Sequence, residues 1–439
     1  MKILSLNSGS SSLKYMIFDY EKSKVLCSGI VERIKEKVSS MEYTTDTVDK
    51  TEECHCPTHK EAIDLILKAI VDPKEGVLGS LKEISAVGHR VLHGGAKFRA
   101  SVLITDEVVQ GFKDLYPLGP LHNPANVAGI EATRAALPDV PQMAIIDTAW
   151  HQTMPQYTHM YALPYEWYEK HHIQKYGFHG TSFLYVAHRT AVLLKKKLSD
   201  CNLVICHIGN GASVNAVKGG KSFDTSMGLT PLEGLVMGTR CGDIDPAVVP
   251  FIMKAENLSC DDISNIMNKK SGILGVTGKY TDRRDVEKAT REGDPRAALV
   301  LEMESYRIRK YIGAYTAALG RVDAVVFTAG VGERSPLIRS KALSGLSCMG
   351  IDVDEKKNLL SNTRNAETCI SKDSSPIKIF VVPTDEERVF IEDIVTLLQG
   401  KTVGESYTFD SPDYVNNQRV EGLKKDLQKF PGLENIIVK

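Results

Sequence analysis

The sequence predicts an α/β protein that is built from two similar halves. Short apolar runs that end in glycine or polar side chains alternate with stretches of helical periodicity. Two segments, residues 2–19 and 203–217, each have the pattern of strand, glycine-containing turn and returning strand, and they lie about 200 residues apart. The length of 439 residues is sufficient for two or three domains with cores of their own.

The two predicted hairpins indicate an internal duplication with a site between the halves. In the alignment of the two hairpins, the segment Ser8-Gly9-Ser10-Ser11 matches Asn210-Gly211-Ala212-Ser213. A chance pair of hairpins is the alternative, because short motifs recur often.

Composition and charge narrow the class of protein. Apolar residues make up 42% and charged residues 25%, which is ordinary for a soluble globular protein. The net charge of −1 gives no reason to expect nucleic acid or an anionic membrane as a partner. The N-terminus becomes polar too early for a signal peptide, and we find no apolar run of spanning length. Nine cysteines spread over the chain favour reduced thiols, so we expect a cytoplasmic location.

The stretch of residues 203–246 contains most of the groups that would bind a phosphate. An apolar strand is followed by the turn Gly209-Asn210-Gly211, and Arg240 follows with Asp243 and Asp245 nearby. Glycines let backbone N–H groups approach an anion closely. The alternative is a hairpin with ordinary turn glycines. Residues 215–222 resemble a P-loop, but Asn215 replaces its first glycine and no helix clearly follows, so we reject that motif.

Two further candidates follow predicted strands in the first 150 residues. Arg90 lies at the end of one such strand, beside glycines, and suits a carboxylate clamp, with a surface salt bridge as the alternative. Asp147 follows the strand of residues 143–146, where α/β proteins usually place their sites.

Two histidines are also candidates. His122 precedes Asn123, the expected N-cap of a helix with Pro124 in its first position, and helix N-termini bind anions. His179 lies between two glycines just before a predicted helix. A structural role is the alternative for each.

The remaining patterns are weaker. A helix should run from Pro295 to about Gly320, with a core-facing apolar stripe of Leu301, Ile308, Ile312, Tyr315 and Leu319. Strand 324–327 leads into a Gly-x-Gly turn. Thr384 and Glu387 would form a capping box. Cys54-His55-Cys56 with His59 lacks the spacing of a zinc site, so we expect a solvent-facing segment there.

Several segments, taken together and in order along the chain, resemble the acetate kinase family. They are Asn7-Ser8-Gly9-Ser10-Ser11-Ser12-Leu13-Lys14, Gly88-His89-Arg90-Val91-Leu92-His93-Gly94-Gly95, Leu121-His122-Asn123-Pro124, Asp147-Thr148-Ala149, Tyr176-Gly177-Phe178-His179-Gly180-Thr181-Ser182, residues 203–246, Phe327-Thr328-Ala329-Gly330-Val331-Gly332-Glu333 and Pro383-Thr384-x-Glu386-Glu387.

The resemblance implies the duplicated two-domain, ribonuclease H-like fold that acetate and sugar kinases share with Hsp70 and actin, with the active site in the cleft. It implies an N-terminal domain over residues 1–150, onto which helix 385–399 packs, and a nucleotide-binding domain over 151–384. The tail of residues 401–439 lies outside the family pattern. Homodimers are typical of the family.

The implied reaction is reversible, direct in-line phosphoryl transfer from ATP to acetate, giving ADP and acetyl phosphate, with Mg²⁺ as cofactor and Mn²⁺ as its substitute. The resemblance assigns the residues as follows: catalysis to Arg90, Asp147, His179 and Arg240; nucleotide and phosphate contacts to Lys14, His207, Asn210, Gly211, Asp282, Arg283, Arg284, Gly330 and Val331; the metal to Asn7 and Glu386, beside Asp147; and the substrate pocket to Leu92, Leu121, His122, Phe178 and Pro231. An acceptor carboxylate is already ionised at neutral pH, so no general base is required.

Departures from the family pattern concern specificity. Leu92 stands where valine is common, and the extra methylene should favour acetate over propionate by about 1–3 kcal/mol. Arg283, Arg334 and Asp385 replace residues near the nucleotide and leave its preference open. A propionate or butyrate kinase is the nearest alternative. A pyrophosphate-dependent kinase and an Hsp70-like or actin-like nucleotide-gated binding protein are more remote alternatives.

Overall fold

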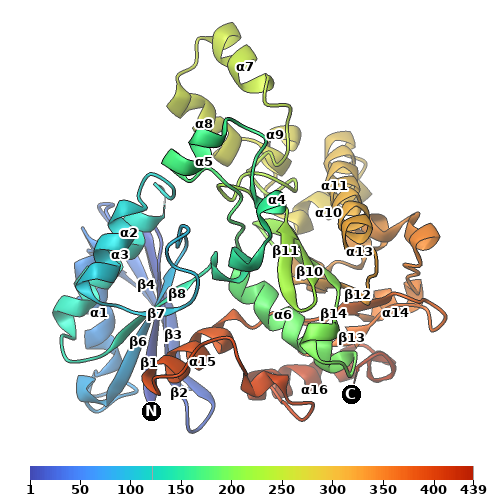
Figure 1. Cartoon of the computed structure of the whole chain (residues 1–439). Helices are drawn as coiled ribbons and strands as arrows, with labels where there is room; N and C mark the ends of the chain where they lie inside the picture. Colours follow the sequence, from blue (N-terminus) through green and yellow to red (C-terminus); the bar gives the residue numbers. More distant parts are fainter. Residues whose placement is uncertain (121, 439) are drawn as a thin grey trace. The chain divides into compact units, whose positions relative to one another are not determined.

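The computed structural model describes residues 1–120 and 122–438, and it divides into two compact units (Figure 1). Unit 1 consists of Met1–Trp150 together with Asp385–Thr408. Unit 2 consists of His151–Thr384 together with the chain from Phe409 onward. The chain therefore leaves unit 1, forms most of unit 2, returns to unit 1 for one helix, and ends in unit 2.

Unit 1 is organised around an eight-stranded sheet with the order β5-β4-β3-β2-β1-β6-β8-β7. Its strands are β1 (Lys2–Ser8), β2 (Ser12–Asp19), β3 (Lys24–Glu32), β4 (Ser39–Thr44), β5 (Asp49–Cys54), β6 (Ile84–Val91), β7 (Val102–Leu103) and β8 (Gln142–Ile146). Its helices are α1 (His59–Ile70), α2 (Asp106–Asp114), α3 (Asn123–Ala136) and α15 (Glu386–Leu398).

Apolar residues on both faces of this sheet are covered by helices. Leu4 and Leu6 of β1 pack in a cluster with residues of α1, whereas Ile3 packs with Phe390 and Ile394 of α15. This alternation follows from the period of two in a strand, which sends successive side chains to opposite faces. Burial on both faces explains why the parallel strands read as nearly continuous apolar runs.

Unit 2 contains a six-stranded sheet with the order β11-β10-β9-β12-β14-β13. Its strands are β9 (Leu203–Ile208), β10 (Ala212–Lys218), β11 (Lys221–Thr225), β12 (Ala324–Thr328), β13 (Thr368–Cys369) and β14 (Lys378–Val381). Its helices are α4 (Gln156–His159), α5 (Tyr165–His171), α6 (Gly180–Leu193), α7 (Val248–Glu256), α8 (Cys260–Lys269), α9 (Gly272–Thr277), α10 (Arg283–Arg291), α11 (Pro295–Leu319), α12 (Ala329–Arg334), α13 (Pro336–Leu343), α14 (Glu355–Leu360) and α16 (Val420–Lys429).

The two sheets share one plan, which confirms the predicted duplication. In unit 1 the order β3-β2-β1-β6-β8-β7 has an antiparallel meander, two parallel pairings and an antiparallel edge strand. The order β11-β10-β9-β12-β14-β13 of unit 2 repeats each of these pairings in the same sequence.

The alignment of the two hairpins differs from the predicted one. The turn of the first hairpin lies between Ser8 and Ser12, and that of the second lies between Ile208 and Ala212. The strand ends therefore place Gly9 opposite Gly209, two residues away from the predicted match with Gly211. The prediction followed the Gly-x-Ser pattern, whereas strand pairing follows the buried apolar residues.

Two helix starts also differ from the prediction. The N-cap of α3 is His122 instead of Asn123, so Asn123 is the first helical residue. The N-cap of α15 is Asp385, whose side chain accepts a hydrogen bond from the Arg388 backbone amide, and the predicted Thr384–Glu387 capping box is wrong. An aspartate directly before the helix competes with threonine for this role, and it is the stronger N-cap.

The segment around the close cysteines faces solvent only in part: His55 is exposed and Cys54 half-buried, whereas Cys56 and His59 are buried, contrary to the expectation. Cys56 and His59 are 1% and 3% exposed. The His59 Nε2 atom lies 2.8 Å from the Gly9 carbonyl oxygen, so the imidazole supports the first hairpin turn. The β4–β5 hairpin, which leads into this segment, contains few apolar residues. The sequence pattern therefore did not predict that the segment is packed.

Other predicted helices are confirmed. Helix α11 begins after Asp294, whose side chain caps it, and ends before Gly320. Its predicted stripe is buried, from Leu301 through Ile308 to Leu319. None of the helices in the part of the chain that the structure describes is long and apolar enough to cross a membrane.

Asp393 of α15 provides a test of the packing in unit 1. It is buried and accepts hydrogen bonds from Ser101 (2.5 Å) and Tyr407 (2.9 Å), and burial raises the pKa of its carboxyl group to about 6. A raised native pKa contributes stability below the unfolded value, near 4, that is lost as pH rises through 6.

We therefore expect the free energy of unfolding of wild type to fall as the pH rises from 4 to 8, because Asp393 ionises. In Asp393→Asn, whose side chain cannot ionise, this loss should be absent, a difference on the order of 2 kcal/mol. Urea unfolding of both proteins at the two pH values measures this change. Asp139→Asn, which alters an exposed carboxylate of the same unit, is the matched control and should show no such difference from wild type. Equal pH dependence of Asp393→Asn and wild type would contradict the prediction.

Candidate functional site in two halves

The predicted residues of unit 1 gather at the carboxyl ends of three neighbouring strands. Strands β1, β6 and β8 are parallel and adjacent, with Asn7 near the end of the first and Arg90 near the end of the second. Asp147 follows the third, and its amide donates to the Val91 carbonyl (3.0 Å). The carboxyl ends of parallel strands are where α/β folds place ligands.

Arg90 and Asp147 form an ion pair at this edge, with 3.1 Å between Arg90 Nη2 and Asp147 Oδ2. The Asp147 side chain is fully buried, whereas Arg90 is partly exposed. Asp147 and, to a smaller extent, Glu386 at the start of α15 raise the pKa of the Arg90 guanidinium. Among the described residues the Arg90 guanidinium donates to Asp147 through Nη2 alone. Its Nη1 atom therefore remains available for a ligand carboxylate.

Two asparagines of α3 fix the loop that follows Arg90, and sequence reasoning missed both of these contacts. Asn126 accepts from the Leu92 amide (3.0 Å) and donates to the Ser8 carbonyl (2.7 Å). Asn123 accepts from the amide of His93 and donates to its carbonyl (3.3 and 3.0 Å). The end of β1 and the loop after β6 are thereby held together by buried amides. The sequence pattern could not predict these contacts, because the partners of both asparagines lie far away in the sequence.

The other predicted residues of unit 1 lie around this edge. Lys14 is exposed on β2 and pairs in register with Asn7. Leu92 is 9% exposed, and His122 is the N-cap of α3. Leu121 lies outside the described residues.

In unit 2 the two predicted histidines stack on each other. The rings of His179 and His207 are 4.1 Å apart and nearly parallel. A hydrogen bond of 2.8 Å orients each ring: one joins His179 Nδ1 and the Ser213 hydroxyl, and the other joins His207 Nδ1 and the Ser182 hydroxyl. His179 has a positive φ of 58°, a strained backbone conformation that often marks functional sites.

Arg240 and His179 both face the backbone of Gly211. A Cβ atom at Gly211 would lie 2.8 Å from Arg240 Nη2 and 3.2 Å from His179 Nε2, so only glycine leaves these side chains in place. Arg240 Nη1 donates to the Pro231 carbonyl (2.6 Å). Asn210 lies beside this group, since its carbonyl accepts from the Gly238 amide at 3.4 Å.

The loop that carries Arg240 is closed at its ends, Gly234 and Asp243, by one carboxylate. Asp243 accepts from the Gly234 amide (2.8 Å) and the Tyr311 hydroxyl (2.8 Å), and it pairs with Arg307 (3.3 Å). Both Tyr311 and Arg307 belong to α11. The long helix thus supports the loop, although only its apolar stripe was predicted.

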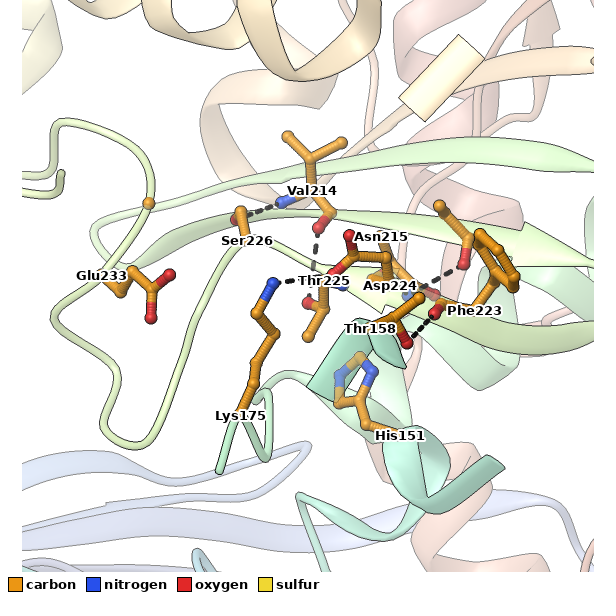
Figure 2. Close-up of polar contacts among 12 residues, drawn as sticks. His151, Thr158, Lys175, Val214, Asn215, Phe223, Asp224, Thr225, Ser226 and Glu233 are labelled. Atoms are coloured by element: carbon orange, nitrogen blue, oxygen red, sulfur yellow. Dashed lines mark hydrogen bonds and ion pairs between the residues drawn. The ribbon is translucent and has the colours of Figure 1, made fainter. Parts of the chain in front are cut away.

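A buried hydrogen-bond chain supports the backbone before His179. His151 Nε2 lies 2.9 Å from the Phe178 carbonyl, which only accepts, so this nitrogen is the donor. His151 Nδ1 must then accept from the Ser222 hydroxyl (2.8 Å), which accepts from Asn215 Nδ2 (2.8 Å). Figure 2 shows His151 and Asn215 within a polar layer in which Lys175 also pairs with Asp224 (2.8 Å). These residues position Phe178 and His179, and sequence reasoning assigned this role to none of them.

The predicted nucleotide contacts differ in how they are held. Asp282 caps α10 and pairs with the exposed Arg284. Arg283 is buried and pairs with Glu304 (2.5 Å), so its charge is already paired inside the unit. Gly330 borders open space, because an added Cβ would meet no atom within 4 Å, and Val331 beside it is half-buried.

The predicted Gly-x-Gly turn after β12 is instead the short helix α12, which contains Gly330 and is held by a buried arginine. Arg339 donates through Nη1 to the carbonyls of Gly332 (2.7 Å) and Glu333 (3.1 Å), and burial lowers the pKa of its guanidinium to about 9. The Glu333 side chain accepts from the Thr384 amide (3.2 Å) and from Arg364 Nε (3.0 Å). These contacts hold α12 firmly after β12, although Gly330 of this helix borders open space.

The geometry of unit 2 suits an anion. The one hydrogen bond of Arg240 goes to a neutral carbonyl, no carboxylate pairs with it among the described residues, and burial lowers the pKa of its guanidinium. A cation that is removed from water without a counter-ion attracts an anionic ligand. No group of three or more His, Cys, Asp or Glu side chains with metal-binding geometry occurs in residues 1–120 and 122–438.

Comparison with known proteins agrees with the resemblance seen in the sequence. The profile of the acetokinase family matches residues 2–392. The curated acetate kinase of Geobacter metallireducens is 56% identical over 95% of this chain and its own full length. That of Treponema pallidum is 52% identical over all of this chain and 99% of its own.

Solved structures give the same result. Porphyromonas gingivalis acetate kinase has a TM-score of 0.86 and 45% identity, and the match covers 90% of this chain and 99% of that protein. A propionate kinase from Francisella tularensis has a TM-score of 0.83 and 39% identity, covering 91% of this chain and all of that protein. The predicted fold is thereby confirmed, and the chain belongs to the acetokinase family.

Proposed function

We propose that the chain catalyses reversible, direct in-line transfer of the terminal phosphoryl group of ATP to acetate, giving ADP and acetyl phosphate. Family membership supports the reaction class, because the curated relatives are named acetate kinases. The observation that carries the proposal is the Arg240 guanidinium beside Gly211 and His179, with no carboxylate partner among the described residues. A phosphoryl group in transfer brings the negative charge that such a cation lacks.

The residues of unit 2 would act on the phosphoryl group. Arg240 would neutralise its charge, and His179 would donate from Nε2 to an equatorial oxygen while Ser213 fixes the ring through Nδ1. The Gly211 backbone lets these groups approach closely, and His207 supports His179 by stacking. No residue has to remove a proton, because acetate is already ionised at neutral pH.

The residues of unit 1 would hold the carboxylate and the metal. Arg90 is oriented by Asp147 and keeps Nη1 for an acetate oxygen. The oxygen atoms of Asn7, Asp147 and Glu386 match the hard donors that Mg²⁺ prefers, and Mn²⁺ would substitute. When bound, the metal would neutralise part of the charge of the ATP phosphates. Lys14 on the neighbouring strand adds a cation.

The remaining parts of the proposal concern the nucleotide, the location and the assembly. Gly330 and Val331 would contact the nucleoside, with Asp282 and Arg284 beside it. Arg283 would act indirectly, since it is paired with Glu304. Nine free thiols support a cytoplasmic location, and the resemblance to the family supports a homodimer.

Trapping of acyl phosphate by hydroxylamine, with ATP and Mg²⁺ and either acetate, propionate or butyrate, tests the proposed reaction. We expect a strong acetyl signal and a weaker propionyl signal, because Leu92 is buried and narrows the pocket. Arg240→Ala should lower the rate by roughly 10³-fold, as loss of a charge-stabilising arginine does elsewhere. Arg90→Ala should lower the rate and, in addition, raise the KM for acetate.

The other outcomes separate the alternatives. Activity with propionate or butyrate but not with acetate would assign the chain to a sister kinase such as the Francisella relative. Activity with pyrophosphate in place of ATP would change the donor. Hydrolysis of ATP without acyl phosphate from any acid would favour a nucleotide-gated binding protein.

Gly211→Ala tests the close packing of the catalytic side chains without removing any of them. The added methyl would displace Arg240 and crowd His179, so we expect kcat to fall about 100-fold. Stability should change by less than about 1 kcal/mol, because Gly211 does not have a positive φ. Gly313→Ala, at an open position of α11, is the matched control. A Gly211→Ala variant with the activity of the control would contradict this geometry.

A further inference from the structure

From Phe409 onward the tail, which lies beyond the family match, is firmly packed on unit 2. Phe409 is fully buried, with its ring 4.9 Å from that of Tyr185 and 5.9 Å from that of His188. Arg189 of α6 donates to the carbonyls of Phe409 (2.7 Å) and Ser411 (3.1 Å). The tail therefore begins its path along unit 2 with an apolar anchor and a buried cation.

The rest of the tail is anchored at the edge of the sheet. Asp426 of α16 accepts from Thr363 (2.6 Å) and Asn365 (2.7 Å). The Ile436 carbonyl accepts from the Cys369 amide (2.9 Å), so the end of the tail adds a bond to β13. A segment with these contacts is a fixed part of the unit and is able to hold other groups in place.

One residue of the tail holds the segment after β14. Arg419, the N-cap residue of α16, donates through Nη1 to the Pro383 carbonyl (3.1 Å) and through Nη2 to the Thr384 carbonyl (2.7 Å). The planar guanidinium suits two neighbouring acceptors, which a lysine ammonium cannot match as rigidly.

The segment that Arg419 holds leads directly to the stacked histidines. The Thr384 hydroxyl lies 2.8 Å from that of Ser182, which lies 2.8 Å from His207 Nδ1. His207 stacks on His179 at 4.1 Å. A shift of Thr384 would thus alter the hydrogen bond that orients His207, and through it the position of the His179 ring.

We propose that Arg419 is a positioning residue, through which the C-terminal tail fixes Thr384, Ser182 and His207 behind the catalytic His179. The inference rests on the proposed phosphoryl transfer, and it gives a catalytic role to a segment outside the family match, which ends at residue 392. The residue acts on the phosphoryl side of the reaction, so its effect should appear in kcat more than in the KM for the acid.

Variants of the full-length protein test this role with two independent readouts. The amides of Val382 and Thr384, which donate to Phe327 and Glu333, report on the segment by hydrogen exchange without any need for activity. Steady-state acyl phosphate formation reports on the site. Lys424→Ala is the matched control, because Lys424 is an exposed cation of α16 whose ion pair in the part of the chain that the structure describes is with Glu421.

We expect Arg419→Ala to increase exchange at residues 382–384 and to lower kcat about tenfold, with the KM for acetate changed by less than about twofold. Arg419→Lys keeps the charge but not the paired geometry and should fall in between. Lys424→Ala should match wild type in both readouts.

Two results would overturn the inference. Exchange in Arg419→Ala at the rate of the control would mean that the tail does not hold the segment. Faster exchange with an unchanged kcat would mean that the contact is structural only. A wild-type protein that makes no acyl phosphate would instead refute the proposed function, and the exchange data would still show whether Arg419 holds residues 382–384.

Discussion

The charge of Arg240 is the feature on which the rest of the site depends. A half-buried guanidinium that, among the described residues, donates to a neutral carbonyl and pairs with no carboxylate is unfavourable until an anion arrives. Arg90 is in the opposite state, because it is paired with the buried Asp147. The two arginines therefore suit different tasks. The paired one is held in a fixed orientation for a carboxylate, and the unpaired one is available for charge that develops during transfer.

Each side chain for which we propose a catalytic role is placed by contacts from distant parts of its own unit. His151 holds the carbonyl before His179, Asp243 closes the loop of Arg240, and Asn126 ties the loop after Arg90 to β1. These supports are mostly neutral hydrogen bonds to the backbone, which orient a group without cancelling its charge. The duplicated sheets supply the frame, because both present strand ends and a glycine turn at one edge.

The sequence was sufficient to predict the fold and the family, because both depend on local patterns. The stripe of α11 and the strand before Gly330 have clear periodicity, and the motifs occur in order. The supports were not predicted, since contacts such as His151 with Ser222 join residues about 70 positions apart. The shift of the N-cap to His122 and the burial of Cys56 have the same cause, which is tertiary packing that local propensity does not encode.

In the proposed reaction the phosphoryl group passes directly between two oxygen atoms that cationic side chains hold in line. The most direct test is the stereochemical course of transfer from ATP that carries a chiral, isotopically labelled terminal phosphoryl group. A single in-line displacement predicts inversion of configuration at phosphorus in the acetyl phosphate. Retention would mean two displacements through a phosphorylated residue of the enzyme, and it would contradict the account.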